Sequence, residues 1–365
     1  MTADTCRTGG EPDAGLRTRP SAWSEFANSP AAAVRDWLSG VAARLCVADP
    51  APVLGLLLDR TFGRPRGDRD CAANTLALGA APLELSFSER EPTALRLDLE
   101  PFEPGLSPAE RRAETVEVTA ATLRSSFGAE AAELFGKASA PWLAPAARAE
   151  RFGAFYGAAF DADGPAEATL YLELPRDDGW MPPGAGPGLL DTVCAHLPAA
   201  APLMHAISCN RAGLAELTSF AYLDELRLLD LAPLFGALGL AHRAPALLDA
   251  ALALTGGLFA LPAGTVVLGL RRTAAGIELK LELLLACLPV DAWGAVERLL
   301  AARPALTAAF RRWRMAMGEG GKDGCARPGV VNVVSARTGP EGGVELNVYV
   351  RPASLARPCG TGAGA

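Results

Sequence analysis

Five segments of the chain alternate strictly between apolar and polar residues, and each follows another short segment of strand-forming residues. Alternation with a period of two sends successive side chains to opposite faces of a β-strand. Turn-forming residues such as Asp163–Gly164–Pro165 and Ala275–Gly276 separate the members of each pair, which predicts five β-hairpins. The alternating second strands are predicted at Ala94–Pro101, Ala168–Pro175, Leu217–Leu223, Ile277–Leu284 and Val344–Arg351. Their partners are predicted at Pro82–Ser88, Phe152–Phe160, Met204–Cys209, Thr265–Arg271 and Val330–Arg337.

Between the hairpins the apolar residues recur about every three and a half positions, which predicts helices. Ser107–Pro108 begins one of them with a capping residue and a proline in the first turn. The predicted helices are Ala31–Leu45, Pro108–Phe127, Ala129–Leu134, Gly188–His196, Leu226–Leu238, Pro245–Leu254 and Val290–Met317. The order helix, strand, strand, helix thus recurs about five times. We expect one domain over residues 21–352, with residues 1–20 and 353–365 as disordered tails.

The two faces of the second strands differ in the same way in nearly every hairpin. In Ala94–Pro101 the leucines share one face, while Arg96, Asp98 and Glu100 share the other. Helices need an apolar surface to pack on, so we expect them on the leucine and valine face. The polar faces then line the inside of a closed barrel of ten antiparallel strands, an α+β fold with room for a ligand. An open sheet with one solvent-exposed polar face is the alternative.

Composition excludes several classes of function. The formal net charge of −7 argues against a nucleic-acid partner, and no uninterrupted apolar stretch is long enough to span a membrane. The eight cysteines are scattered without a C-x-x-C pair, which predicts free thiols in a reducing cytosol. The three histidines share no metal-ligand spacing, and no phosphate-binding glycine loop or nucleophile elbow is present. We therefore expect a cytoplasmic protein without a nucleic-acid or membrane partner.

The segment Pro82–Pro101, PLELSFSEREPTALRLDLEP, resembles the aromatic prenyltransferases of the ABBA barrel class, in particular their bacterial dimethylallyltryptophan synthase-like branch. In that family a P-x-E-x-S strand is followed, across a turn, by an arginine and then by E-P. The hairpin spacing over about residues 80–352 supports the resemblance; elsewhere the match is one of pattern. The resemblance implies transfer of a dimethylallyl or longer prenyl group from its diphosphate to an indole or tryptophan-derived aromatic in secondary metabolism. It implies no required cofactor.

The resemblance also implies roles for particular residues. Glu84 matches the catalytic glutamate that accepts the indole N–H, and Arg96 matches the arginine that holds the prenyl diphosphate. Tyr171, Tyr222 and Tyr349 match tyrosines that shield the allyl cation from water. The alternatives are structural ion pairs for the two charged residues and simple filling of the barrel for the rings. Three of only four tyrosines lie at corresponding positions of three second strands, which favours the functional interpretation.

The sequence departs from the family at the diphosphate cations. Thr169 replaces a lysine two residues before Tyr171, and Thr218 and Phe220 replace an arginine and a lysine before Tyr222. Lys280 and Arg351 are lumen cations that can compensate, and Arg271 is a weaker candidate. A diphosphate carries about three negative charges, and unneutralised charge in a partly dry site costs several kcal/mol. The predicted substrate-binding residues are Arg96, Thr169, Tyr171, Phe220, Tyr222, Lys280, Tyr349 and Arg351.

The missing cations leave three outcomes open. Mg²⁺ can bridge the lumen acids and a diphosphate, although the family often works without a metal. The barrel can instead perform a different cofactor-free reaction on a cationic or amine substrate, served by its acidic lumen. Or it can bind a small molecule without catalysis. A closed barrel leaves no sheet edge to pair, so we expect a monomer or a weak homodimer.

Overall fold

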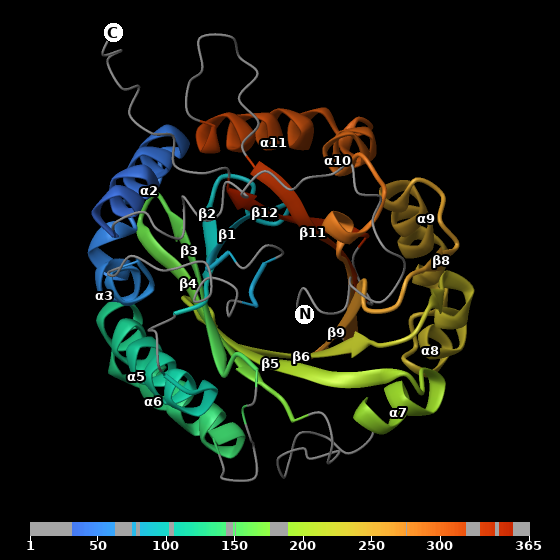
Figure 1. Cartoon of the computed structure of the whole chain (residues 1–365), viewed down its shortest axis with the longest axis horizontal. Coiled ribbons are helices and arrows are strands. Elements are labelled where there is room, and N and C mark those ends of the chain that lie inside the picture. Colours follow the sequence, from blue (N-terminus) through green and yellow to red (C-terminus); the bar gives the residue numbers. More distant parts are fainter. Residues whose placement is uncertain are drawn as a thin grey trace, which may run out of the picture.

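Ten antiparallel strands close into one barrel in the computed structural model of the chain (Figure 1). The order around the barrel is β1-β12-β11-β10-β9-β6-β5-β4-β3-β2. The strands are β1 (Leu83–Ser88), β2 (Leu95–Leu99), β3 (Ala154–Asp161), β4 (Gly164–Glu173), β5 (Ala200–Asn210), β6 (Gly213–Tyr222), β9 (Val266–Thr273), β10 (Gly276–Leu283), β11 (Gly329–Thr338) and β12 (Glu345–Pro352). The predicted barrel is therefore confirmed, and the open sheet is excluded.

The structure describes residues 31–62, 75–77, 81–101, 106–143, 149, 151–175, 189–274, 276–318, 329–339 and 343–352. The two predicted tails lie outside these residues. In the described part of the chain, no helix is both long and apolar enough to cross a membrane. A short pair, β7 (Leu226–Arg227) and β8 (Ala260–Leu261), forms a separate two-stranded sheet beside the barrel.

Helices surround the barrel on its outer face (Figure 1). They are α2 (Ala31–Leu45), α3 (Ala51–Phe62), α5 (Pro108–Phe127), α6 (Ala129–Ser139), α7 (Leu189–His196), α8 (Ala232–Ala237), α9 (Ala244–Thr255), α10 (Ala292–Leu300) and α11 (Pro304–Met317). The Ser107 side chain accepts from the Glu110 N–H, and the Glu110 side chain accepts from the Ser107 N–H, so the predicted cap is a full capping box.

Three helix predictions need correction. The single helix expected over Val290–Met317 is two helices, because Pro304 lacks the N–H that a continuous helix would use. The segment Leu226–Leu238 starts as strand β7 and a 3₁₀ turn before α8 begins. The apolar helix α3 was not predicted, although its leucines at positions 54, 57 and 58 share one buried face.

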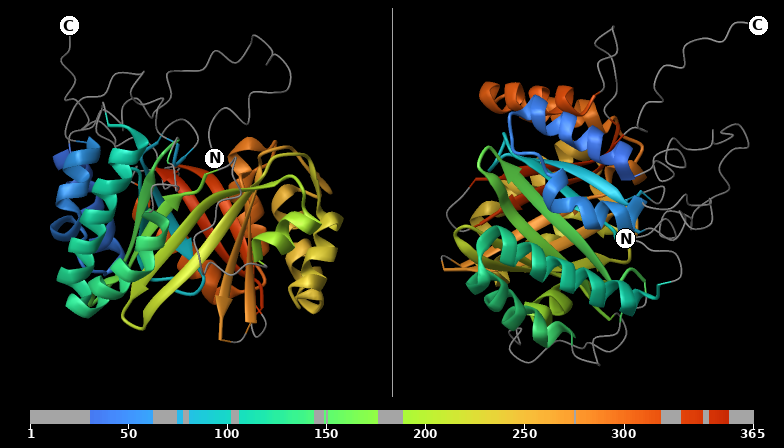
Figure 2. Two further views of the ribbon diagram at one scale, coloured as in Figure 1. Left: turned by 90° about the horizontal axis from the view of Figure 1, so that it is seen from below. Right: turned by 90° about the vertical axis from the view of Figure 1, so that its left-hand side faces the viewer.

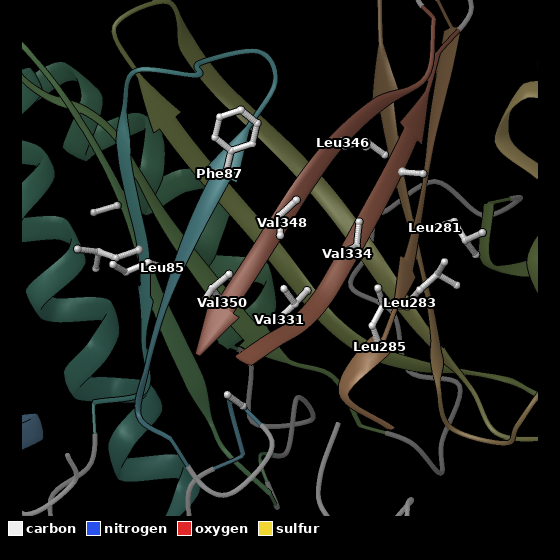
Figure 3. Close-up of a cluster of buried hydrophobic side chains, with 14 of the residues drawn as sticks. Leu85, Phe87, Leu281, Leu283, Leu285, Val331, Val334, Leu346, Val348 and Val350 are labelled. Carbon is white, nitrogen blue, oxygen red and sulfur yellow. The ribbon is translucent and has the colours of Figure 1, made fainter. Parts of the chain in front are cut away.

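The outward faces of the strands and the inner faces of the helices form the main core. Figure 3 shows part of this layer on β1, β12, β11 and β10, with Leu85, Val348 and Val334 among the labelled side chains. Phe87 of β1 packs edge-on against Phe310 and Trp313 of α11, with ring centroids 5.1 and 5.8 Å apart. Burial of this continuous apolar layer holds the barrel closed and leaves the polar strand faces for the inside.

First and second strands of the hairpins alternate around the barrel. As a result the five hairpin turns lie at one end, called here the hairpin end, and the connections through helices lie at the other, the helix end (Figure 2). The position of a residue along its strand therefore determines how far it lies from each end of the lumen.

Candidate active site

The lumen contains a cavity with about 960 Å³ of empty space, including its solvent-open part. Along each strand, residues that line this cavity alternate with residues that point outward into the core, as the pleat of a strand requires. Side chains from all ten barrel strands contribute to it. The lining residues are Leu76, Glu84, Asp98, Phe152, Phe155, Tyr171, Leu203, Met204, Leu217, Ser219, Val267, Lys280, Glu282, Leu284, Cys287, Asn332, Val333 and Tyr349. A wall of aromatic and aliphatic side chains with a few polar groups suits an aromatic small molecule.

The cavity is apolar toward the helix end. Phe152 and Phe155 stack with ring centroids 4.2 Å apart, and they form a buried cluster with Leu203, Ala221 and Val267. These residues lie near the starts of β3, β5 and β9 and near the end of β6, so they share one end of the barrel. The cluster provides a dry surface on which an aromatic ring or a prenyl chain can pack.

Glu84 lies on the cavity wall, where only 4% of its surface is exposed. The Asn332 side-chain amide donates a hydrogen bond to Glu84 Oε1. Burial, and after it the neighbouring Asp98 carboxyl, raises the pKa of Glu84 to about 8. Glu84 thus meets the lumen as a predominantly protonated acid at neutral pH, and its carbonyl oxygen can still accept an N–H.

Asp98 is the direct strand partner of Glu84, across β1 and β2. Burial raises the pKa of Asp98 to about 6, while Arg96, Lys280 and a hydrogen bond with the Tyr171 hydroxyl oppose that rise. At neutral pH the pair therefore holds about one negative charge, carried mainly by Asp98. The prediction that Tyr171 faces the lumen fits this contact, since the ring lines the same cavity.

Lys280 and Tyr349 form the polar side of the cavity. Lys280 Nζ donates to the Tyr349 hydroxyl at 2.9 Å and lies 5.1 Å from the centroid of the same ring. The ammonium also forms an ion pair with Glu282 Oε1 at 2.5 Å. Burial lowers the pKa of Lys280, but the charge and hydrogen bond of Glu282, together with Tyr349, raise this pKa above its ordinary value. Lys280 is therefore a charged lumen cation whose position is fixed by two contacts.

Arg96 lines a smaller polar pocket that shares Asp98, Tyr171 and Tyr349 with the main cavity. Its guanidinium forms ion pairs with Glu91 at 2.5 Å and with Glu167 at 2.6 Å. Thr169 lines the same pocket, where its hydroxyl forms a hydrogen bond with Ser208 at 2.8 Å. Arg96 is thus on the lumen side as expected, in the structural ion pairs that the alternative interpretation described.

Tyr222 and Phe220 do not face the lumen. On β6 the cavity wall carries Leu217 and Ser219, so the residues between them point outward. Phe220 and Tyr222 both belong to the outer core, where they are 0% and 8% exposed. The prediction that they bind substrate is wrong, because a shift of one residue exchanges the two faces of a strand.

The remaining predicted cations are coupled to carboxylates. Arg351 follows Tyr349 on the same face of β12, and burial lowers its pKa to about 10 while Glu84 opposes the fall. Arg351 is not part of the cavity wall. Arg271 forms an ion pair with Glu278 at 2.7 Å. Arg96, Arg271 and Lys280 are therefore already engaged with acids.

Two groups on the wall were not expected. Asn332 holds Glu84 but lies beside a β-bulge between Val331 and Val333, which breaks the alternation that would have identified it. Cys287 is disulfide-bonded, so the expectation of free thiols is wrong for this residue, whereas Cys46, Cys194 and Cys209 are free. The described residues contain no group of three or more His, Cys, Asp or Glu placed to hold a metal ion.

Searches of family models and of curated protein sequences found no match, but solved structures do match in fold. A 6-dimethylallyltryptophan synthase from Micromonospora olivasterospora, solved with DMASPP and Trp, is similar with a TM-score of 0.63 and 18% identity, covering 89% of this chain and 98% of its own. A 5-dimethylallyl tryptophan synthase from Streptomyces coelicolor, also solved with DMASPP and Trp, gives 0.63 and 14%, covering 91% and 98%. The prenyltransferase PriB gives 0.61 and 13%, covering 89% and 96%. The expected ABBA fold is thereby confirmed.

Proposed function

We propose that this chain transfers a prenyl group, dimethylallyl or longer, from its diphosphate to an indole or tryptophan-derived aromatic. One observation carries the proposal: a single lumen joins an aromatic apolar end to a polar side with Lys280, Tyr171 and Tyr349, and Glu84 lies on the same wall. Proteins of similar fold were solved with DMASPP and Trp. The combination matches the needs of a reaction that separates an anion from a carbocation beside an aromatic ring.

In the proposed reaction Arg96 and Lys280 hold the diphosphate. The allylic C–O bond breaks, and its electron pair leaves with the diphosphate oxygen. The cation then lies against the rings of Tyr171 and Tyr349, which stabilise it without quenching it as water would. A carbon of the aromatic ring forms the new C–C bond while Glu84 accepts the ring N–H, and an ionised carboxylate takes the displaced ring proton.

The diphosphate must displace acids to enter. Arg96 would exchange Glu167 and Glu91 for phosphate oxygens, and Lys280 would exchange Glu282. Such an exchange keeps each cation paired before and after binding, so the empty lumen is not destabilised by unpaired charge. We propose that these two cations suffice without Mg²⁺, and that activity persists in the presence of a metal chelator.

The direct test is to incubate the purified chain with dimethylallyl diphosphate and an indole library, with and without Mg²⁺, and to detect products by mass spectrometry. Arg96→Ala should abolish turnover. Arg211→Ala is the matched control, because Arg211 is exposed and pairs with Asp161 outside the lumen. Full activity of Arg96→Ala, or no product from any acceptor, would contradict the proposal.

The absence of some of the family's cationic residues from the described lumen supports a second candidate function. Thr169 lines this lumen where the family has a lysine, and the lumen residues of β6 are the uncharged Leu217 and Ser219. This favours binding, or a cofactor-free conversion, of a cationic or amine molecule. Calorimetric titration with a non-hydrolysable prenyl diphosphate separates the two functions: the absence of a heat of binding favours the second function.

We further propose that the protein is cytoplasmic and is a monomer or a weak homodimer. Sedimentation measurements test the oligomeric state.

A further inference from the structure

Two carboxyl groups face each other on the wall of the cavity. Glu84 and Asp98 are directly paired across β1 and β2, and their exposed fractions are 4% and 7%. Both line the lumen, together with Glu282 and Lys280. Three acids and one lysine are thus the charged groups of the cavity wall among the described residues. Two buried carboxyl groups side by side are unfavourable unless a cation compensates for them.

The cations near the pair are directed elsewhere. Lys280 is in contact with Glu282 and with the Tyr349 hydroxyl, and Arg96 is in contact with Glu91 and Glu167. In the part of the chain that the structure describes, neither Glu84 nor Asp98 forms an ion pair with a lysine or arginine. The charged groups that act on the two carboxyls from the surrounding strands are Arg96, Glu167, Lys280, Glu282 and Arg351.

The position of Asp98 is built into the strand beside it. Gly157 of β3 is the direct partner of Asp98, and a Cβ at Gly157 would lie 2.6 Å from Asp98 Oδ1 and 3.0 Å from Tyr171 Cε2. Only glycine leaves room for the carboxylate and the ring at this distance. The Tyr171 hydroxyl bonds Asp98, and a carboxylate has acceptor sites for further N–H donors.

An independent group on the same cavity lacks a partner. Ser219 of β6 is 1% exposed and lines the lumen, and its hydroxyl forms no hydrogen bond with any residue that the structure describes. A buried polar group without a partner is unfavourable unless a ligand or water satisfies it. Ser219 therefore points to a polar ligand in the same lumen as the acid pair.

We propose that Asp98, with Glu84 opposite it, binds the ammonium group of the aromatic acceptor, so that the substrate class is aromatic amines that are cationic at neutral pH. The ammonium supplies the compensating charge, and its remaining N–H bonds can reach other lumen acceptors such as Ser219. Glu84 keeps the aromatic N–H that the proposed function gives it. The inference rests on the proposed function for the aromatic acceptor alone, and it does not depend on the prenyl donor.

The test is calorimetric titration of the whole chain, without any prenyl diphosphate, with tryptamine and with tryptophol. These two indoles have the same skeleton and differ in an ammonium against a hydroxyl group. At about pH 7 tryptamine should bind roughly tenfold more tightly or better. Repeating the titration in buffers of different ionisation enthalpy should show release of up to about one proton with tryptamine, because the ammonium lowers the pKa of Glu84. Tryptophol should release none.

Asp98→Asn should remove the preference for tryptamine, and Glu216→Gln should retain it. Glu216 is the matched control because it loses the same charge on the outward face of β6, beside His205. Equal affinity of the native chain for both indoles, no binding of tryptamine, or an unchanged preference in Asp98→Asn would overturn the inference. The proton release needs no variant, so the inference stays testable if Asp98→Asn fails to fold. Tight tryptamine binding without prenyl transfer would refute the proposed function and support this inference.

Discussion

Glu84→Gln is expected to remove most of the pH dependence of the chain's stability between about pH 5 and about pH 9. Burial and the Asp98 carboxyl raise the pKa of Glu84 from 4.5 to about 8 in the folded chain. The folded state therefore holds this proton more tightly than the unfolded state. The resulting stabilisation is complete below the ordinary pKa and is lost as the pH rises through about 8.

The magnitude follows from the two pKa values. Each unit corresponds to about 1.4 kcal/mol, so a change from 4.5 to about 8 is worth about 5 kcal/mol of free energy of unfolding. Because Asp98 shares the same environment and titrates with Glu84, we expect a measured loss of about 3–5 kcal/mol across this range. Glutamine keeps an oxygen that can accept the Asn332 amide bond and carries no titrating proton.

The assay is urea unfolding followed by circular dichroism at several pH values. The native chain should lose stability steadily toward alkaline pH, whereas Glu84→Gln should lose much less and should be the more stable of the two at about pH 9. Glu216→Gln, on the outward face of β6, should follow the native chain. Equal slopes for the native chain and Glu84→Gln would refute the reasoning that burial keeps this proton on the carboxyl group.

Three further changes test other parts of the structure. Thr169→Lys restores a family cation beside Arg96 and Glu167, and it should strengthen binding of a non-hydrolysable prenyl diphosphate about tenfold in calorimetry; weaker binding would contradict a diphosphate in this pocket. Gly157→Ala places a methyl group 2.6 Å from Asp98 Oδ1, so urea unfolding should report a loss of about 1–3 kcal/mol, and no loss would mean that the carboxylate moves freely. Ser107→Ala removes the capping box of α5 and should cost about 1 kcal/mol in the same assay, while an unchanged midpoint would show that tertiary packing alone holds the helix end.

The sequence predicts the barrel well because nearly every hairpin repeats the same pattern of one apolar and one polar face. In Ile277–Leu283 every lumen residue is charged and every outward residue except the first is leucine, so only one face can meet the helices. Because four of the five hairpins repeat this asymmetry, a closed barrel is the arrangement that buries all apolar faces at once. Helix α3 was missed because it continues no hairpin and adds to the outer layer alone.

The second strand of the third hairpin shows where such reasoning fails. In β6 neither set of alternate residues is clearly polar: one is Leu217, Ser219 and Ala221, and the other is Thr218, Phe220 and Tyr222. Packing decides the choice, since the two aromatic rings fill the space beneath the helices and the small residues face the lumen. The volume of the Tyr222 ring, and not its position in the alternation pattern, therefore decides which face of the strand it occupies.

The ion pairs of the lumen lay beyond prediction because they depend on which strands become neighbours. Glu167 of β4 forms an ion pair with Arg96 of β2 across β3. Lys280 forms an ion pair with Glu282 of its own strand rather than with Asp98 of β2. Once Lys280 and Arg96 are paired in this way, the Glu84–Asp98 pair is left without an ion-pair partner among the described residues. A diphosphate has to compete with glutamates for its cations, whereas an ammonium finds carboxyl groups without an ion-pair partner in the described chain. The order of the strands therefore has two consequences. The prenyl diphosphate can bind only by replacing glutamates on Arg96 and Lys280, whereas an ammonium group can bind Asp98 and Glu84 directly.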